Sequence, residues 1–468
     1  MLKAERKNIL LLIGIKLALT LPFINSFPID LDEPFSIFHA QKSLPELFEL
    51  FRNENNPPLH FLLLHGWEKL FGTDLFAVRS LSLVFSILTI PALFLLARIY
   101  LTRIPAYAIL LLFLFSDFHH YHSMEARTYS LLVLLFTLTA LVISRILLEN
   151  KKERKYFVLL GVLNILLFYT HYISLFVFAS ELILVLLFLK ELHLKYLVIT
   201  CMIALAGILP WMGILFDRTS TITSGGTWVP EAAVSELYGF INKFLNNRAT
   251  SAVLILSAGL TIYLSRKTIR KFISVNHSRI IILLVLFAVP FSLAFILSVT
   301  SDFRFFLDRY LFFLTIPLFL LIVGLFDDHS FHSKFLFLPF FITYLISFNL
   351  KPDNNRDGDQ LARTVRTLKP DKILIAPGYY QLTFLYHYDR VLFENYRAVE
   401  MKRTNSIFVV ETGMGIESTL LTGGTIILIN AGLDFTEPNN TLEQYIALRK
   451  EKISITKFKG GYTVSEWQ

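Results

Sequence analysis

The first 350 residues of the chain consist largely of long apolar blocks separated by polar segments. These blocks show neither the two-residue alternation of a half-buried strand nor the one-sided stripe of a surface helix. Because a helix needs about 20 mostly apolar residues to cross a bilayer, we predict about eleven transmembrane helices. They cover residues 9–26, 79–97, 105–118, 129–147, 156–170, 172–189, 196–215, 250–265, 279–299, 309–326 and 334–350.

Shorter apolar stretches lie in the first long polar segment, at about 27–78. The run Leu59–Leu64 is too short to cross a bilayer and is followed by His65, Glu68 and Lys69. Such a run predicts a helix lying at the membrane surface. The stretch Leu44 to Phe51 is also amphipathic.

The pattern changes after Leu350, where Lys351 to Gly358 forms a polar linker. Apolar runs of strand length then alternate with helical patterns, which is typical of a small α/β domain. We predict strands at Lys372–Ala376, Ile407–Glu411, Thr425–Ile429 and Ile453–Phe458, with helices at 358–369, 415–422 and 440–451. The chain is thus divided into a transmembrane domain, 1–350, and a soluble domain, 351–468. Gly413-Met414-Gly415 lacks the full glycine-rich fingerprint of a nucleotide site.

Composition agrees with a polytopic α-helical membrane protein, since 54% of the 468 residues are hydrophobic, 17% are charged and the mean hydropathy is +0.57. A net charge of +8 could suggest nucleic acid as a partner. The basic residues fall between apolar blocks, however, so membrane topology explains them better and no nucleic acid is expected. The single cysteine, Cys201, excludes an internal disulfide and a cysteine metal cluster.

The basic residues also predict the orientation of the chain in the inner (plasma) membrane. Lys3, Arg6 and Lys7 precede the first apolar run as in a signal peptide, but no small-residue cleavage site follows. We interpret the run as a retained first span with its N-terminus in the cytoplasm. The other short inside segments are basic too, which is the positive-inside pattern. An odd number of spans then places the C-terminal domain on the extracytoplasmic face.

Two adjacent carboxylates, Asp32 and Glu33, follow the first predicted span. One interpretation is structural: Asp32 caps a helix and Pro34 fills its first turn. The other is catalytic, because the pair sits where a soluble acceptor and a membrane-held donor could meet.

Other ionisable residues lie at the mouths of predicted spans, where charge is costly and by default marks function. Glu125, Arg127 and Arg309 are such residues, although Arg127 could pair with Glu125 and Arg309 with Asp308. No charge is expected at the span centres. His119, His120 and His122 do not have a known zinc spacing, so no metal site is predicted from them. His171 has a satisfied interfacial histidine as its structural alternative.

The order of several short motifs resembles the GT-C membrane glycosyltransferases, over about residues 1–350. The acidic pair is followed by Asn56-Pro57-Pro58-Leu59-His60, then by Ser123-Met124-Glu125-Ala126-Arg127-Thr128-Tyr129, Thr170-His171-Tyr172 and Asp308-Arg309-Tyr310. The nearest branch is that of the bacterial relatives of dolichyl-phosphate-mannose protein mannosyltransferases and of the lipid A aminoarabinose transferases.

The resemblance implies transfer of a sugar from a polyprenyl-phosphate donor to a lipid, glycan or protein acceptor at the outer face, commonly with inversion. It implies Asp32 as general base, Glu33 as its tuning or positioning partner, and Arg127 and Arg309 as cations at the donor phosphate. His171, His60, Glu125 and Tyr129 would complete the donor site. A lysine of the aminoarabinose branch is missing near His60, where Asn55 and Asn56 stand. No cofactor is indicated, although a divalent metal is used elsewhere in the superfamily.

Two other functions are compatible with a polytopic chain. An O-antigen ligase or polymerase would use diphosphate-linked sugars and usually depends on a large outer loop late in the chain. A transporter or lipid flippase would show paired halves with broken helices near the midplane. The early acidic pair argues against the first, and the absence of internal sequence symmetry argues against the second.

Overall fold

The computed structural model describes residues 3–29, 32–54, 56–217, 229, 231–327, 331–394, 406–410, 421–433 and 440–468. The chain forms two compact units. The first comprises Met1–Asn25 and Ser43–Pro352, and the second comprises Ser26–Lys42 and Asp353–Gln468. Segment 26–42, expected within the first outside loop, therefore groups with the C-terminal residues.

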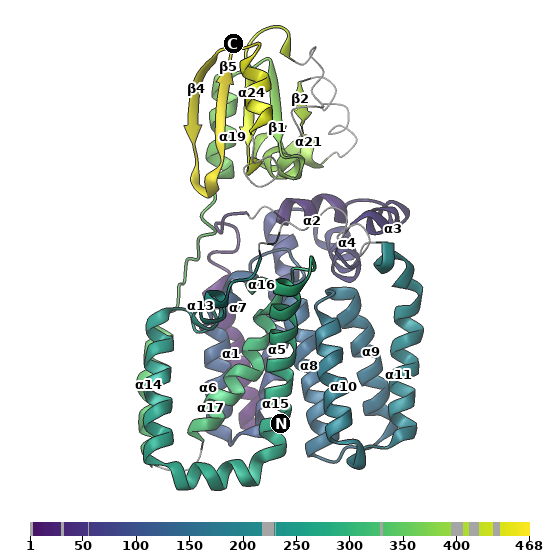
Figure 1. Cartoon of the computed structure of the whole chain (residues 1–468), viewed down its shortest axis with the longest axis vertical. Coiled ribbons are helices and arrows are strands. Elements are labelled where there is room, and N and C mark those ends of the chain that lie inside the picture. The colour runs from purple at the N-terminus through teal and green to yellow at the C-terminus, as the bar shows by residue number, and fades with distance from the viewer. Residues whose placement is uncertain are drawn as a thin grey trace. The chain divides into compact units, whose positions relative to one another are not determined.

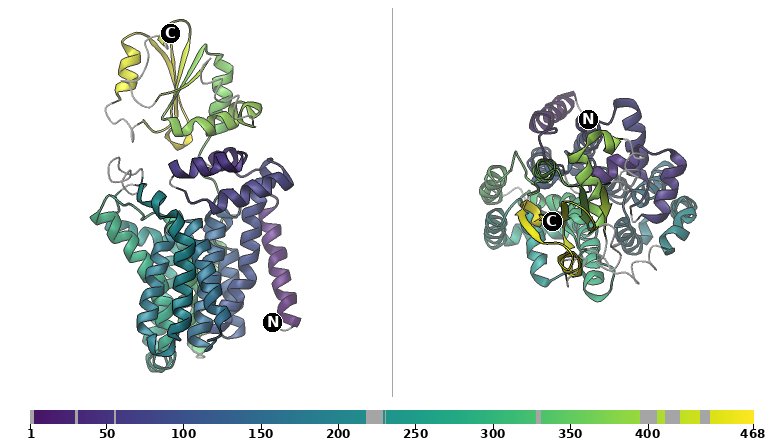
Figure 2. Two further views of the ribbon diagram at one scale, coloured as in Figure 1. Left: turned by 90° about the vertical axis from the view of Figure 1, so that its right-hand side faces the viewer. Right: turned by 90° about the horizontal axis from the view of Figure 1, so that it is seen from above.

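The first unit is built from helices, and its long helices run side by side (Figures 1 and 2). The N-terminal part contains α1 (Lys3–Thr20), α3 (Leu44–Asn53), α4 (Leu59–Phe71), α5 (Leu75–Tyr100), α6 (Arg103–Leu114), α7 (Asp117–His122), α8 (Tyr129–Leu148), α9 (Arg154–Thr170), α10 (Ser174–Leu187) and α11 (Leu194–Ile208). It continues with α13 (Val234–Phe244), α14 (Arg248–Leu264), α15 (Arg266–Thr300), α16 (Asp308–Leu311), the short 3-10 turn η3 (Phe312–Leu314), α17 (Thr315–Phe326) and α18 (Phe331–Ile346).

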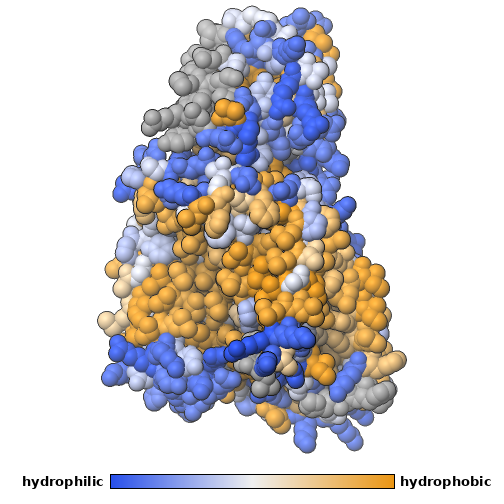
Figure 3. Space-filling view, turned by 180° about the vertical axis from the view of Figure 1, so that it is seen from behind, coloured by the Kyte–Doolittle hydropathy of each residue, from blue (hydrophilic) through white to orange (hydrophobic). Residues whose placement is uncertain are grey.

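A helix overlaps every one of the predicted spans, which confirms the helical membrane fold class. Within the described ranges, five helices are long and apolar enough to cross a bilayer. They are Leu75–Tyr100, Tyr129–Leu148, Leu194–Asp217, Arg266–Thr300 and Asp308–Phe326. Shorter apolar helices cover Arg103–Leu114, Ser174–Leu187, Arg248–Leu264 and Ser333–Ile346. Figure 3 shows a broad hydrophobic band across the helical unit with hydrophilic residues along its lower edge.

The ends of these helices alternate between two faces of the bundle because the connections are short. One face carries the starts of α5 and α8, the end of α9 and the short helices α4, α7, α13 and α16 (Figure 1). The opposite face carries the end of α5, the start of α6 and the end of α17. All six predicted donor-site residues belong to the first of these faces.

Two expectations from the sequence are wrong in the first unit, one about a connecting segment and one about charges at span centres. The segment before the ninth predicted span, expected as a basic loop, is helical from Arg266, and only Asn276 departs from helical dihedrals (φ −107°, ψ 19°). The span centres are not free of charge, because Lys16 is fully buried in α1. Its Nζ donates to Ser123 Oγ at 2.8 Å. Likewise Glu181 of α10 accepts a hydrogen bond from Asn164 Nδ2 of α9 at 2.7 Å.

Small residues set the approach of α9 to α11. A Cβ added at Gly161 would lie 3.1 Å from the backbone oxygen of Thr200, and one at Gly207 would lie 2.4 Å from Ile165 Cδ1. Glycine at both positions lets the two helices pack closely, as small residues do between membrane helices. The close packing fixes the end of α9, which carries His171.

The second unit contains a five-stranded sheet of order β2-β1-β3-β5-β4. Its strands are β1 (Lys372–Ala376), β2 (Ile407–Val409), β3 (Ile426–Asn430), β4 (Lys452–Lys457) and β5 (Thr463–Trp467). Its helices are α2 (Glu33–Ala40), α19 (Gly358–Leu368), α20 (Gln381–Tyr388), α21 (Arg390–Glu394) and α24 (Thr441–Ala447).

The sheet is parallel at β2, β1 and β3 and antiparallel at β5 and β4. Leu374 and Leu428 pack with Leu442 and Ile446 of α24 in one core cluster. Figure 2 shows α24 on one face of the sheet and α19 on the other. Strand β5 was not predicted, and it lies between β3 and β4. Gly413-Met414-Gly415, from which no nucleotide site was predicted, and residues 415–420 of the predicted helix 415–422 lie outside the described residues.

Helix α2 packs against α20 inside the second unit. The rings of Phe38 and Phe393 lie 5.9 Å apart, and Asn354 Nδ2 donates to the Pro28 carbonyl oxygen at 3.2 Å. Asp32 is the N-cap residue of α2 but makes no side-chain cap hydrogen bond, and Pro34 lies in the first turn. The predicted helix start is therefore present, whereas the predicted capping by the Asp32 side chain is not.

Candidate functional site

Arg127 lies in the short connection between α7 and α8, two residues before α8 begins at Tyr129. Its side chain is buried, and its guanidinium carbon lies 6.0 Å from the ring centroid of Tyr129. The intervening residue, Thr128, donates from Oγ1 to the Thr170 carbonyl oxygen at 2.9 Å. This hydrogen bond joins the start of α8 to the end of α9 and so brings the two motifs together.

His171 is the C-cap residue of α9 and lies between α9 and α10. Its ring centroid is 4.7 Å from that of Tyr310 and 6.4 Å from that of Tyr129. Burial, and after it the charges of Arg127 and Arg309, lower the pKa of His171 to about 3. Its Nδ1 accepts a hydrogen bond from the Ile173 backbone N–H at 3.1 Å, so the neutral ring carries its proton on Nε2. The site therefore holds a neutral hydrogen-bond donor beside two cations.

Arg309 belongs to α16, at the start of the apolar segment that ends with α17. Its guanidinium carbon lies 6.0 Å from the ring centroid of Tyr310. The Asp308 carboxylate accepts from the Arg309 backbone N–H at 2.7 Å and from Lys243 Nζ. Lys243 is thus an ion-pair partner of Asp308, which the sequence interpretation paired with Arg309 alone.

His60 is buried on α4, at the surface helix predicted from Leu59–Leu64. Burial, and after it the charge of Arg127, lower the pKa of His60 to about 3. Its Nε2 atom is buried with no hydrogen-bond partner among the described residues. A neutral imidazole with an unused nitrogen next to Arg127 is suited to meet a polar atom of a ligand.

Glu125 pairs with His122, since its Oε2 lies 2.8 Å from His122 Nδ1. Arg127, Arg309, His171 and Tyr129 are called the arginine cluster below. The His122 ring centroid lies 4.7 Å from that of Tyr129, which places the Glu125–His122 pair beside this cluster. Sequence interpretation had weighed His122 as a metal ligand and Glu125 as a partner of Arg127. The structure adds His122 as the link between Glu125 and Tyr129.

The other two histidines of this stretch have separate partners. His119 Nε2 lies 2.8 Å from Thr315 Oγ1, and His120 Nε2 lies 3.1 Å from the Leu350 carbonyl oxygen. Among the described residues, no group of three or more His, Cys, Asp or Glu side chains is arranged to hold a metal ion.

Lys16 is a residue of this region that sequence reasoning missed. Its Nζ donates to Ser123 Oγ, and the His119 carbonyl oxygen lies 3.5 Å away. The lysine of the first span therefore supports the connection that carries Arg127. An ionisable residue inside the apolar run Ile9 to Ile24 was the available signal.

The acidic pair belongs to the second unit. Glu33 is fully buried, whereas Asp32 is partly exposed. Asp32 lies within electrostatic reach of Tyr379, whose pKa is raised by burial first and then by Tyr462 and Asp32, against a lowering by Arg356. The structure thus brings Arg127, Arg309, His171, His60, Tyr129 and Glu125 together in one unit, and it associates Asp32 and Glu33 with the C-terminal domain.

Residues 55–214 match the family model of dolichyl-phosphate-mannose-protein mannosyltransferases. The fold resembles two crystal structures of ArnT from Cupriavidus metallidurans. The structure bound to undecaprenyl phosphate has a TM-score of 0.57 at 12% identity, covering 98% of this chain and 97% of that chain. The apo structure has a TM-score of 0.59 at 11% identity, covering 99% and 98%. No curated protein sequence matches the chain. The chain has a GT-C fold of the PMT/ArnT type.

This GT-C assignment confirms the resemblance drawn from the sequence motifs. The matched family segment contains His60, Glu125, Arg127, Tyr129 and His171, and it ends before Arg309. Together, the family match and the fold indicate a multi-pass inner-membrane glycosyltransferase.

The residues of the arginine cluster are suited to bind an anion next to an apolar surface. Two guanidinium groups rest near tyrosine rings, and two neutral histidines flank them. Guanidinium groups offer planar, paired donors that match phosphate oxygens. The arrangement is therefore suited to hold a phosphate-bearing group at the end of the apolar helices.

Proposed function

We propose that this protein transfers a sugar from a polyprenyl-phosphate-linked donor to an acceptor hydroxyl at the extracytoplasmic face, with inversion at the sugar carbon. The observation that carries the proposal is a partly buried cluster. The guanidinium groups of Arg127 and Arg309 each lie 6.0 Å from a tyrosine ring, and the His171 ring lies 4.7 Å from Tyr310 and 6.4 Å from Tyr129. A related GT-C structure is bound to undecaprenyl phosphate, and that fact supports a lipid phosphate as the donor's leaving group.

The two arginines have a defined task in this reaction. The bond between the sugar carbon and the phosphate oxygen breaks, and its electron pair remains on the lipid phosphate. The phosphate therefore gains negative charge in the transition state. Fixed cations with little access to water stabilise that charge strongly, because they need no reorganisation as it develops. Arg127 and Arg309 supply the cations.

The two histidines serve as neutral hydrogen-bonding groups. His171 donates from Nε2, and a phosphate or sugar oxygen is a suitable acceptor. His60 offers an unused nitrogen next to Arg127. Because burial and the arginine charges hold both rings neutral, neither adds positive charge to the site.

Asp32 is the proposed general base. A hydroxyl is a weak nucleophile at neutral pH, so a carboxylate must take its proton as the new bond to the sugar carbon forms. A single displacement of this kind inverts the sugar carbon. Partial exposure of Asp32 supports access by an acceptor, whereas the fully buried Glu33 is suited to orient its neighbour. No step in this scheme needs a metal.

The extracytoplasmic location rests on charge. The cluster lies at the face of the bundle opposite the basic segments that contain Arg98, Arg103 and Lys271. Basic segments stay in the cytoplasm, so the positive-inside rule favours an outer-face cluster.

The test measures sugar transfer in membranes supplied with a labelled polyprenyl-phosphate sugar. Asp32→Asn keeps the size of the side chain but removes the base, and we expect turnover to fall by about two orders of magnitude or more while the donor still binds. Asp371→Asn, a change at an exposed position of the second unit, is the matched control. Near-normal transfer by a folded Asp32→Asn protein would rule out the base assignment.

A further inference from the structure

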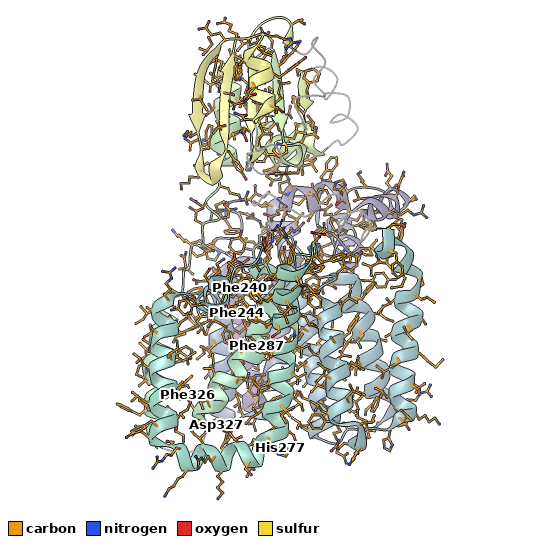
Figure 4. All side chains as sticks on the ribbon, in the orientation of Figure 1. Phe240, Phe244, His277, Phe287, Phe326 and Asp327 are labelled. Atoms are coloured by element: carbon orange, nitrogen blue, oxygen red, sulfur yellow. The ribbon has the colours of Figure 1, made fainter. Side chains whose placement is uncertain are left out.

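A cleft of about 630 Å³ opens at the face of the bundle opposite the arginine cluster. Three segments meet there: the end of α5, the start of α6 and the first half of α15, with Asp327 after α17 closing one side. Figure 4 shows Asp327 and His277 toward the lower end of the helical unit, away from Phe240 and Phe244 of α13. The volume of the cleft is in the range of small-molecule sites.

The lining of this cleft is strongly basic. Arg98, Arg103, Lys271 and Arg279 contribute four positive charges, against the single carboxylate of Asp327. Asp327 is already engaged, because it is 7% exposed and accepts from the backbone N–H and the hydroxyl of Thr102 at 3.0 and 3.1 Å.

The four cations are not neutralised within the cleft. Arg98 Nη1 donates to the Leu101 carbonyl oxygen at 2.8 Å, and Arg279 Nη1 donates to Asn276 Oδ1 at 3.0 Å. Both acceptors are uncharged. In the described part of the chain, no ion pair involves any of the four side chains. An anion entering the cleft would therefore meet unneutralised charge.

Exposed apolar side chains lie in the cleft lining and directly beside it in the sequence. Val275 lines the cleft, and Ile104 follows the lining residue Arg103. Ile104 is 82% exposed next to Arg103, and Val275 is 72% exposed on α15 next to the break at Asn276. The first half of α15 thus carries both basic and apolar side chains, which is typical of a helix lying in a membrane interface. The cleft sits where apolar helices end, so its cations lie at headgroup depth.

We propose that this cleft binds the phosphate-bearing headgroup of an anionic phospholipid. The four basic side chains would contact the phosphate, and Ile104 and Val275 would contact the start of the acyl chains. Basic pockets between membrane helices bind anionic headgroups in this way. Free inorganic phosphate shares the anion chemistry but gains nothing from the exposed apolar side chains. This site is separate from the proposed donor site and does not depend on the proposed reaction.

The experiment uses the purified full-length protein in neutral detergent and measures retained labelled phosphatidylglycerol, with phosphatidylcholine as the reference lipid. We expect the anionic lipid to be retained in preference, and the double variant Arg103→Gln/Lys271→Gln to lower its retention by roughly tenfold. Lys190→Gln/Lys195→Gln removes the same charge from two exposed positions outside the cleft and should retain the lipid. Arg103→Lys/Lys271→Arg keeps the charge and should retain it too.

Three results would overturn the proposal. Equal retention of phosphatidylcholine would show that charge does not select the lipid. An equal loss in the Lys190/Lys195 control would assign the effect to overall surface charge. Full displacement by millimolar inorganic phosphate would make free phosphate the ligand. Thermal unfolding in the same detergent shows whether Arg103→Gln/Lys271→Gln is misfolded. If it is, the double variant Arg103→Lys/Lys271→Arg takes its place: retained lipid supports the proposal, and lost lipid overturns it.

Discussion

Thr128 and Thr170 join the two motifs of the arginine cluster, through a 2.9 Å hydrogen bond from the Thr128 hydroxyl to the Thr170 carbonyl oxygen. The residues on either side of this bond are Arg127, Tyr129 and His171. A bond at the end of α9, where carbonyl groups have no partner within the helix, satisfies an acceptor and fixes the relative position of two helices. The spacing of Arg127 and His171 therefore depends on a residue that has no proposed chemical role.

Thr128→Val should weaken donor use without abolishing it. The substitution keeps the shape of the side chain and removes its hydroxyl, so an orphaned carbonyl should cost about 1–3 kcal/mol and loosen the cluster. We expect the KM for the donor to rise severalfold, with a smaller change in kcat. Thr102→Val, which removes a hydroxyl at the opposite face, is the control. An unchanged KM in Thr128→Val would show that the bond does not set the cluster.

Arg127→Ala should impair the use of the donor far more severely. Loss of one fixed cation at a developing phosphate charge should lower kcat/KM by about two to three orders of magnitude. Arg127→Lys should recover only part of the loss, because an ammonium group lacks the planar fork. Arg145→Ala at the far end of α8 is the control. A donor dependence like that of the unmodified protein would remove Arg127 from the phosphate site.

Two histidines of the candidate site should make the folded state sensitive to acid. His60 and His171 lie outside the spans and have folded pKa values of about 3, against 6.5 in an unfolded chain. Between these values the unfolded chain binds protons that the folded chain does not. The free energy of unfolding should therefore fall as pH decreases from about 6.5 toward 3.

The measurement is thermal unfolding in detergent over that pH window. His171→Gln removes one such group, so the decrease in unfolding temperature between pH 6.5 and pH 4 should be smaller than in the unmodified protein. His277→Gln, at an exposed position, should leave the decrease unchanged. An identical pH dependence in His171→Gln would show that His171 is not held neutral by the fold.

Phe393→Ala should lower turnover, because Phe393 holds the helix α2 that positions Asp32 and Glu33. Phe393 is fully buried and its ring contacts Phe38 of α2, which follows Asp32 and Glu33. Phe393 belongs to α21, so removing it should let α2 move against α21, and a misplaced base lowers kcat by about one to two orders of magnitude. The KM for the donor should stay nearly constant, since the arginine cluster belongs to the other unit.

The control for this change is Phe458→Ala, another buried phenylalanine of the second unit. It should reduce stability to a similar extent, by about 3–5 kcal/mol, and leave kcat nearly unchanged. A drop in kcat of equal size in both variants would assign the effect to general loosening of the domain and not to the position of α2.

The sequence predicted the helices well because membrane spans are set by local composition. Long apolar runs such as 129–147 permit only a helix in lipid, since backbone groups must bond within the segment. The basic run from Arg266 to Lys271 carried no such signal. Charge alone does not separate a loop from an interfacial helix. The missed indication was apolar: Ile269 lies between the charges and Phe272 directly follows Lys271.

The sequence was enough to choose the residues of the candidate site, but not to predict which side chains contact one another. Arg127, His171 and Arg309 could be chosen because charged and polar residues are costly at membrane edges. Which side chain meets which depends on contacts over long sequence separations, as between Lys16 and Ser123. The packing of α2 against α20 is also a contact over a long sequence separation, and nothing in the local sequence around Asp32 indicates it.

That association has a consequence for the order in which the protein is made. Segment 26–42 leaves the ribosome early, whereas its partner helix α20 lies more than 300 residues later in the sequence. At synthesis rates of about 5–20 residues per second, α2 waits on the order of tens of seconds for the surface that covers it. During that interval Phe38 of α2 lacks its ring partner Phe393, which lies still later in the sequence than the start of α20. The acidic segment therefore reaches its final packing only after all the transmembrane segments have been synthesised.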